Sequence, residues 1–359
     1  MPPPDAAPPH PYANLPARAF WRRAVAAEHP SRLSGLADGL PSLAGARIAT
    51  AGSCFAQHIG RALRAQGLAW MDHEPAPGFL GAEAAARLGY GVYSCRYGNI
   101  YSARQLLQLF LQAFGQFQPA EAVWTRDGRH YDALRPTLEP GGFGSAEEVR
   151  ALRVAHLARV KDMFLRLDVL VFTLGLTEAW LAADGTVLPV APGVVAGDYD
   201  PARHRFHNFR HAEVLADLTA FMAALRQVNP RARLLLTVSP VPLVATASGQ
   251  HVLVATTYAK SVLRAVAGEM AMHEPGVSYF PAYEIITGQP SRHMHYNPDL
   301  RTVSEAGVAE VMRHFLAATG TPPATATATT TTAPATAAPV PPPPGFEFCD
   351  EVLLDPGGA

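Results

Sequence analysis

The sequence predicts an α/β fold with a doubly wound, mostly parallel sheet. Two observations support this prediction. Short, continuously apolar runs alternate with amphipathic helical patterns between residues 46 and 316, as in βαβ units whose strands are covered by helices on both faces. Hydrophobic residues make up 48% of the 359-residue chain and charged residues 16%, a composition that supports a sizeable core.

The first predicted βα unit begins at Arg47. A short run of small and β-branched residues, 47–52, ends at Gly52-Ser53. Residues 56–66 follow as a helix, with Ile59 and Leu63 four positions apart and a glycine as stop signal.

The same alternation recurs along the chain. Residues 146–166 form an amphipathic helix with a serine and two glutamates at its start, and 169–173 form a buried strand. A second helix at 212–228 precedes a strand at 233–238. The last predicted elements are a helix at 257–272, a strand at 277–283 and a helix at 303–315.

Four segments surround or interrupt this pattern. Residues 1–45 are an N-terminal extension, and 70–140 are a less regular stretch, with a helix at 103–114, that we interpret as an inserted cap. Residues 317–345 are threonine, alanine and proline, which predicts a disordered linker. The tail, 346–359, regains apolar and acidic residues, typical of a segment that docks on a partner or folds back on its own domain.

Composition narrows the function classes. A formal net charge of −1 argues against nucleic acid as a partner. The longest apolar runs are too short for a membrane helix, so membrane insertion is not expected. Cys54, Cys95 and Cys349 are too few and too widely spaced for a disulfide framework or a zinc site. The sequence as given therefore predicts a cytoplasmic protein with no metal and no cofactor.

Ser53 is the first candidate for chemistry. It lies where a predicted strand leads into a helix, and in parallel sheets ligands bind at the carboxyl ends of strands. The helix N-terminus supplies N–H donors and a positive field for an oxyanion. A serine there can also act only as a helix cap.

A wider set of strings favours chemistry. Ser53 lies within GSCFA (52–56), and four more strings follow: YGNIYSARQL (97–106), TLGLTEAW (173–180), TVSPVPL (237–243) and YFPAYE (279–284). In this order, over residues 45–316, they resemble the GSCFA family, which is related to the SGNH/GDSL hydrolases. The resemblance implies a flavodoxin-like sheet and a serine nucleophile.

The resemblance also implies an oxyanion site. Besides the Ser53 N–H, the matching positions are Gly98 or Asn99 and, in the third block, Gly175 with Thr177. SGNH enzymes have asparagine where Thr177 stands, but its hydroxyl can still donate a hydrogen bond. Glu178, which follows, is better suited to orienting a base or binding substrate.

The general base is the largest departure from the family pattern. SGNH enzymes carry Asp-x-x-His before the last helix, whereas Asp299 is followed at that spacing by Thr302. Serine is a weak nucleophile without a base. His251, after the 233–238 strand, is the preferred candidate.

Several alternatives remain open. His293 or His295 could replace His251 as base, and Glu284 could replace Glu178 in orienting it. Cys54 could be the nucleophile instead of Ser53. His204, His207 and His211 have helical spacing, but spacing alone does not make a metal site.

Two functions follow. The first is an esterase or acyltransferase acting on O-acyl groups, in particular O-acetyl, of a small molecule or glycan. The second is a catalytically inactive SGNH-like protein that binds a glycan or a protein, with the C-terminal tail as a possible contact. A nucleotide-binding domain is disfavoured, because no Gly-x-Gly-x-x-Gly or Walker sequence follows a predicted strand.

Overall fold

A four-stranded parallel sheet forms the centre of the protein. The computed structural model describes residues 10–37, 39–320 and 349–355. The strands lie in the order β1 (Ile48–Gly52), β4 (Val169–Leu174), β8 (Arg233–Val238) and β9 (Val277–Phe280). Trp70 forms a parallel bridge with Ile48 on the free side of β1. With this bridge as a residual second strand, the order is the flavodoxin-like 2-1-3-4-5.

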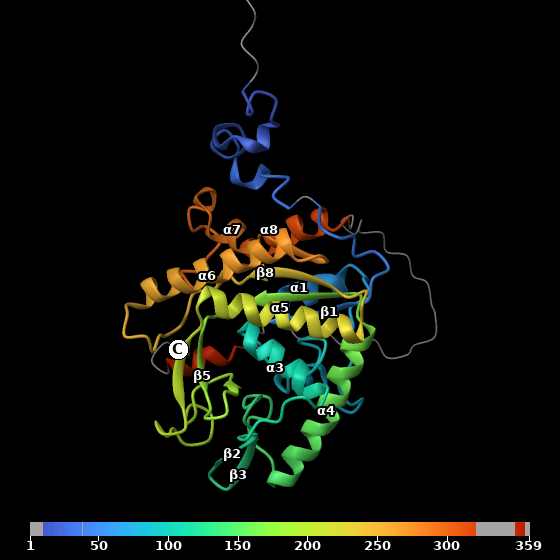
Figure 1. Ribbon diagram of the computed structural model, residues 1–359, viewed down its shortest axis with the longest axis vertical. Coiled ribbons are helices and arrows are strands. Elements are labelled where there is room, and N and C mark those ends of the chain that lie inside the picture. Colours follow the sequence, from blue (N-terminus) through green and yellow to red (C-terminus); the bar gives the residue numbers. More distant parts are fainter. Residues whose placement is uncertain (1–9, 38, 321–348, 356–359) are drawn as a thin grey trace, which may run out of the picture.

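Helices cover both faces of this sheet (Figure 1). One face packs against α1 (Ala56–Ala65), α7 (Ala282–Thr287) and α8 (Glu305–Ala318). The other face carries four helices: α3 (Ala103–Ala113), α4 (Ala146–Arg166), α5 (His211–Val228) and α6 (Val252–His273). Every residue of β4 is buried, which is why its sequence is almost entirely apolar rather than alternating.

Smaller elements lie outside the central sheet. The stretch predicted as a cap contains α2 (Ala82–Arg87), α3 and a hairpin of β2 (Val123–Arg126) and β3 (Arg129–Asp132). A separate antiparallel sheet has the order β6-β5-β7, with these bounds: β5 (Glu178–Leu181), β6 (Val187–Leu188) and β7 (Arg205–Asn208).

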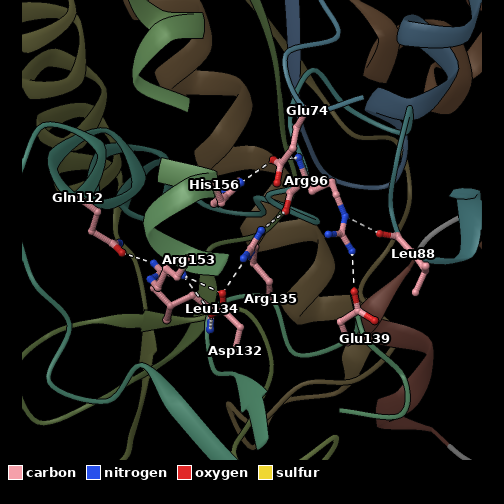
Figure 2. A network of polar contacts seen from close by, with 10 residues as sticks. All are labelled: Glu74, Leu88, Arg96, Gln112, Asp132, Leu134, Arg135, Glu139, Arg153 and His156. Carbon is pink, nitrogen blue, oxygen red and sulfur yellow. Dashed lines mark hydrogen bonds and ion pairs between the residues drawn. The ribbon is translucent and has the colours of Figure 1, made fainter. Parts of the chain in front are cut away.

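A buried ionic network ties the cap to α4 (Figure 2). The Asp132 carboxylate accepts hydrogen bonds from Arg135 Nε at 2.9 Å and from Arg153 Nη1 at 3.0 Å. His156 Nδ1 lies 2.7 Å from Glu74 Oε2. Nearby guanidinium groups lower the pKa of Asp132 to about 2 although burial opposes this, whereas burial lowers the pKa of His156 to about 4.

The predicted α/β fold is confirmed, with differences at element boundaries and two missed sheets. The last strand ends at Phe280 rather than at residue 283, because Pro281 has no N–H for the ladder. Helix α6 starts at Val252, five residues early, because the His251 side chain accepts the Leu253 N–H and caps it. The hairpin of β2 and β3 and the antiparallel sheet of β5, β6 and β7 were not predicted, since their strands are very short.

The two ends of the chain are described only in part. The N-terminal extension contains short helical turns at Ala17–Ala19, Arg22–Ala26 and Pro30–Arg32. Most of the predicted linker, from residue 321 on, lies outside the described residues. Residues Asp350–Leu354 of the tail form a short 3₁₀ helix, η5, drawn in red beside β5 in Figure 1. None of the described helices is long and apolar enough to cross a membrane.

Candidate active site

Ser53 lies directly beyond the carboxyl end of β1. Gly52 precedes it with φ +139°, and a Cβ there would meet the Thr173 carbonyl oxygen at 2.5 Å, so only glycine allows β1 to run this close to β4. Ser53 is 3% exposed. Its N–H donates to Thr173 O at 3.1 Å, while its Oγ makes no hydrogen bond with another described residue.

Gly175 faces Ser53 from the end of β4. A Cβ at position 175 would lie 2.9 Å from Ser53 Cβ and 3.2 Å from the Tyr101 ring. Its N–H donates to Tyr101 O at 2.9 Å and is already engaged. The two residues lie on either side of the topological switch point between β1 and β4, where flavodoxin-like sheets bind ligands. The structure therefore brings together these two predicted site residues.

Asn99 is the second predicted donor found beside the serine. Its Oδ1 lies 2.5 Å from the Tyr93 hydroxyl, which is also 3.1 Å from Ser53 O. Asn99 Nδ2 donates to Asp350 Oδ2 at 2.9 Å. Gly98 adopts the left-handed φ of +71° that turns the chain into Asn99. The side-chain amide of Asn99 is thus presented to the crevice, where a carboxylate of the C-terminal tail binds it.

Lys260 is a site residue that the sequence prediction missed. It comes from α6, is 1% exposed, and donates from Nζ to Gly175 O at 2.8 Å. Burial lowers its pKa, and the negative charge of Glu351 partly opposes this effect. The sequence did contain a signal for this residue, because Lys260 stands between Ala259 and Leu263 on an apolar helix face. A lysine that is buried there needs a polar partner, since buried lysines are rarely unpaired.

A row of buried hydroxyls extends from Ser53 along the sheet edge. Thr173 and Thr237 are register neighbours in β4 and β8, and Thr177 follows β4. All three are 0% exposed, and their Oγ1 atoms make no hydrogen bond with another described residue. Buried hydroxyls are normally paired, so this edge has polar capacity available to a ligand.

An apolar cavity of about 220 Å³ lies beside Tyr101, the residue whose ring a Cβ at Gly175 would meet. Tyr101 and Leu176 form its end nearest Gly175, and the tail contributes Glu351 and Leu354. The remaining apolar lining comes largely from the small antiparallel sheet and the loop after β8, including Trp180, Leu188, Val190, Phe206 and Leu243. The cavity has the character of a small-ligand site, mostly apolar with a few polar groups.

The predicted histidine bases do not contact Ser53. His251 is exposed and caps α6 through Nδ1. His293 is exposed with φ +60°. His295 Nδ1 lies 3.3 Å from Ile285 O and lines another cavity, between α7 and the N-terminal extension. At the position of the family histidine, Thr302 donates to Asp299 Oδ2 at 2.8 Å.

The two candidate orienting carboxylates have other partners. Glu178 lines the cavity and accepts hydrogen bonds from Thr246 Oγ1 at 2.6 Å and Ala247 N at 3.3 Å. It therefore holds the loop that leads to His251 through Thr246 and Ala247 and not through the imidazole. Glu284 pairs with Arg264 and accepts from the Tyr279 hydroxyl, and it lines the other cavity together with His295.

The three closely spaced histidines each contact a different carboxylate. His204 lies 3.0 Å from Glu121, His207 3.0 Å from Glu213, and His211 3.3 Å from Glu269. Within the described part of the chain, no group of three or more histidine, cysteine, aspartate or glutamate side chains is placed to hold a metal ion.

Fold and site together define an α/β protein of the SGNH-hydrolase kind, with a buried serine at the switch point of a flavodoxin-like sheet. Residues 47–315 match the GSCFA family, and the chain belongs to it. The match spans the whole central sheet and ends within α8. No curated protein matches the chain.

Proposed function

We propose that this protein is a serine esterase or acyltransferase that acts on O-acyl groups, with Ser53 as the nucleophile. One observation carries the proposal. The Ser53 hydroxyl is buried at the switch point without a hydrogen-bond partner among the described residues, beside Gly175, whose missing Cβ leaves room for the serine. A side chain serving only as a helix cap would accept a backbone N–H.

The chemistry follows from this placement. Ser53 Oγ attacks the acyl carbonyl carbon, its proton passes to a base, and the carbonyl oxygen gains a negative charge. The Asn99 amide and the Thr177 hydroxyl can donate to that oxygen, whereas the Ser53 N–H is engaged by Thr173. Collapse of this tetrahedral intermediate expels the alcohol, which takes the proton back from the base, and leaves an acyl-serine. Water then hydrolyses the acyl-serine, or its acyl group is transferred to an acceptor hydroxyl. O-acetyl groups of glycans are our proposed substrates, with Trp180 in the cavity able to stack on a sugar ring.

Two groups are candidates for the base. His251 follows the strand adjoining the site, and movement of the loop held by Glu178 would be needed to bring it to Ser53. Lys260 is already buried beside Gly175, and its lowered pKa increases the neutral fraction that can accept a proton.

The test is turnover of p-nitrophenyl acetate by the purified protein and four variants. Ser53→Ala should abolish turnover, and labelling by a fluorophosphonate should be lost with it. If turnover is lost in His251→Ala and retained in Lys260→Met, the base is the histidine. If turnover is retained in His251→Ala and lost in Lys260→Met, the base is the lysine. Arg150→Ala, on the exposed face of α4, is the control. Turnover unchanged by Ser53→Ala would refute the proposal.

The second candidate function is ligand binding without catalysis. It is favoured by one observation, the hydrogen bond between Thr302 and Asp299 at the position where SGNH enzymes carry their histidine. A protein of this kind would bind an acylated glycan in the cavity without cleaving it. Calorimetric titration with such a glycan, beside Trp180→Ala, distinguishes this function from turnover.

A further inference from the structure

The C-terminal segment, residues 349–355, lies in the crevice beside Ser53. Figure 1 shows its short helix η5 next to β5, far along the chain from the strands that frame the site. Asp350 is 3% exposed and Glu351 7% exposed, although both are acidic. Buried carboxylates require partners, and those partners identify what the crevice recognises.

The first carboxylate is held by side chains of the cap. Asp350 Oδ2 accepts from Asn99 Nδ2 at 2.9 Å, and Asp350 Oδ1 accepts from the Thr137 hydroxyl. These contacts lower the pKa of Asp350, but burial outweighs them and raises it. The Asn99 amide is the donor we assign to the oxyanion of the ester reaction, so the tail carboxylate occupies that donor.

The second carboxylate is paired with a cation. Arg301 Nη2 lies 3.3 Å from Glu351 Oε2, and both side chains are largely buried. The charge of Glu351 also acts on buried Lys260. Because Arg301 stands in the family's fifth block, one position before Thr302, this block now provides a positive charge for the tail.

Apolar and thiol contacts also hold residues 349–355 in the crevice. Leu354 joins Glu351 in lining the cavity, which the tail thereby closes on one side. Cys349 packs against the core cluster that contains Cys54 and makes a side-chain hydrogen bond with Cys54. The segment is therefore fixed at Cys349, Asp350, Glu351 and Leu354, while Val352 and Leu353 remain about half exposed.

We propose that the Ser53 crevice contains a binding site for a peptide segment with two adjacent carboxylates, and that residues 349–355 of the same chain are its resident ligand and inhibit the enzyme. The contacts alone support occupancy of the site by this segment, whereas its inhibitory role rests on the proposed function. A carboxylate is also what ester hydrolysis leaves, so Asp350 on Asn99 resembles bound product. Removing the segment takes away the carboxylate partners of the Asn99 amide and of Arg301 together.

The binding test uses the full chain and its own thiols. Oxidised glutathione takes one electron and one proton from each of Cys54 and Cys349, which join in a disulfide, and is itself reduced to two glutathione molecules. Peptide mass mapping after oxidation should find this crosslink in the wild type. In the variant Asp350→Lys, Glu351→Lys, crosslinking should slow by about tenfold or more. Val352→Ser, on the exposed side, is the matched control.

Three outcomes bear on occupancy. Slower crosslinking in the lysine variant but not in the control supports it. Equal rates in all three proteins would overturn the proposal, and so would a crosslink that joins two chains. In a second assay, a labelled peptide of residues 349–359 should bind the lysine variant and be displaced by unlabelled peptide, but a peptide with lysine at 350 and 351 should not displace it.

Inhibition by the segment is measured separately from its occupancy of the crevice. The lysine variant should turn over p-nitrophenyl acetate faster than the wild type, and added 349–359 peptide should reverse the gain. Peptide binding without any change in a Ser53-dependent activity would overturn the inhibitory role and leave the binding site. If Ser53→Ala has no effect on turnover, the enzyme proposal fails, but crosslinking and peptide binding still decide whether the segment occupies the crevice.

Discussion

Removing the Asp132 carboxylate should destabilise the fold strongly, because it is the shared counter-charge of two buried arginines. Asp132, Arg135 and Arg153 are each no more than 9% exposed. Asp132→Ala leaves both guanidinium groups in a low-dielectric interior without that anion. Breaking a buried pair from one side costs about 3–5 kcal/mol. We therefore expect the free energy of unfolding to fall by about 4 kcal/mol.

Urea denaturation followed by circular dichroism at pH 7 measures this loss. The matched control is Glu147→Ala, which removes a carboxylate 3.3 Å from Arg150 on the exposed side of α4. Its transition midpoint should stay close to that of the wild type, since exposed pairs contribute little. If Asp132→Ala costs less than about 1 kcal/mol, the buried arginines are compensated in another way, and the reasoning is refuted.

Three further outcomes follow from the same structure. Gly52→Ala should prevent correct pairing of β1 with β4, because the added Cβ would meet Thr173 O at 2.5 Å. We expect a loss of soluble protein or a lowered melting temperature, and an unchanged melting temperature would contradict this. Gly175→Ala should keep most of the stability but reduce esterase turnover by at least about tenfold, because its Cβ would crowd Ser53; turnover equal to wild type would exclude crowding. The pKa of His156 is about 4 in the fold against 6.5 unfolded, so the unfolded chain takes up a proton first as pH falls. Stability is then complete above pH 6.5 and declines by up to ~3 kcal/mol towards pH 4, and in His156→Gln urea midpoints measured between pH 7 and pH 5 should show a flatter decline.

The central sheet was predictable because its strands are buried on both faces. The runs at β4 and β8 are mostly apolar, and α4 has a clear start in Ser145, whose side chain accepts the Glu148 N–H. These are local signals that sequence periodicity captures. The sheet of β5, β6 and β7 carries no such signal, because strands of two to four residues are held by their neighbours rather than by pattern.

Part of the site was predictable for a different reason. Ser53, Asn99 and Gly175 stand in strings shared with a family, and the structure brings them together. The sequence did not identify Lys260 and Arg301 as site residues, because each belongs to the site only through contacts with residues distant in the sequence. His251 was chosen from its position after a strand, which does not determine the direction of a side chain that instead caps α6.

The network in Figure 2 has a consequence for how a ligand reaches the crevice. Arg96 donates to Glu139 at 3.0 Å and Arg135 donates to Arg96 O at 2.9 Å, so the loops of the cap are joined to one another as well as to α4. A region fastened at several buried points does not swing like a hinged lid, since each point would have to expose an unpaired charge. The cap side of the crevice, which supplies Asn99 and Thr137, is therefore preorganised, and association with a ligand there should be limited by clearing the entrance rather than by reshaping the cap.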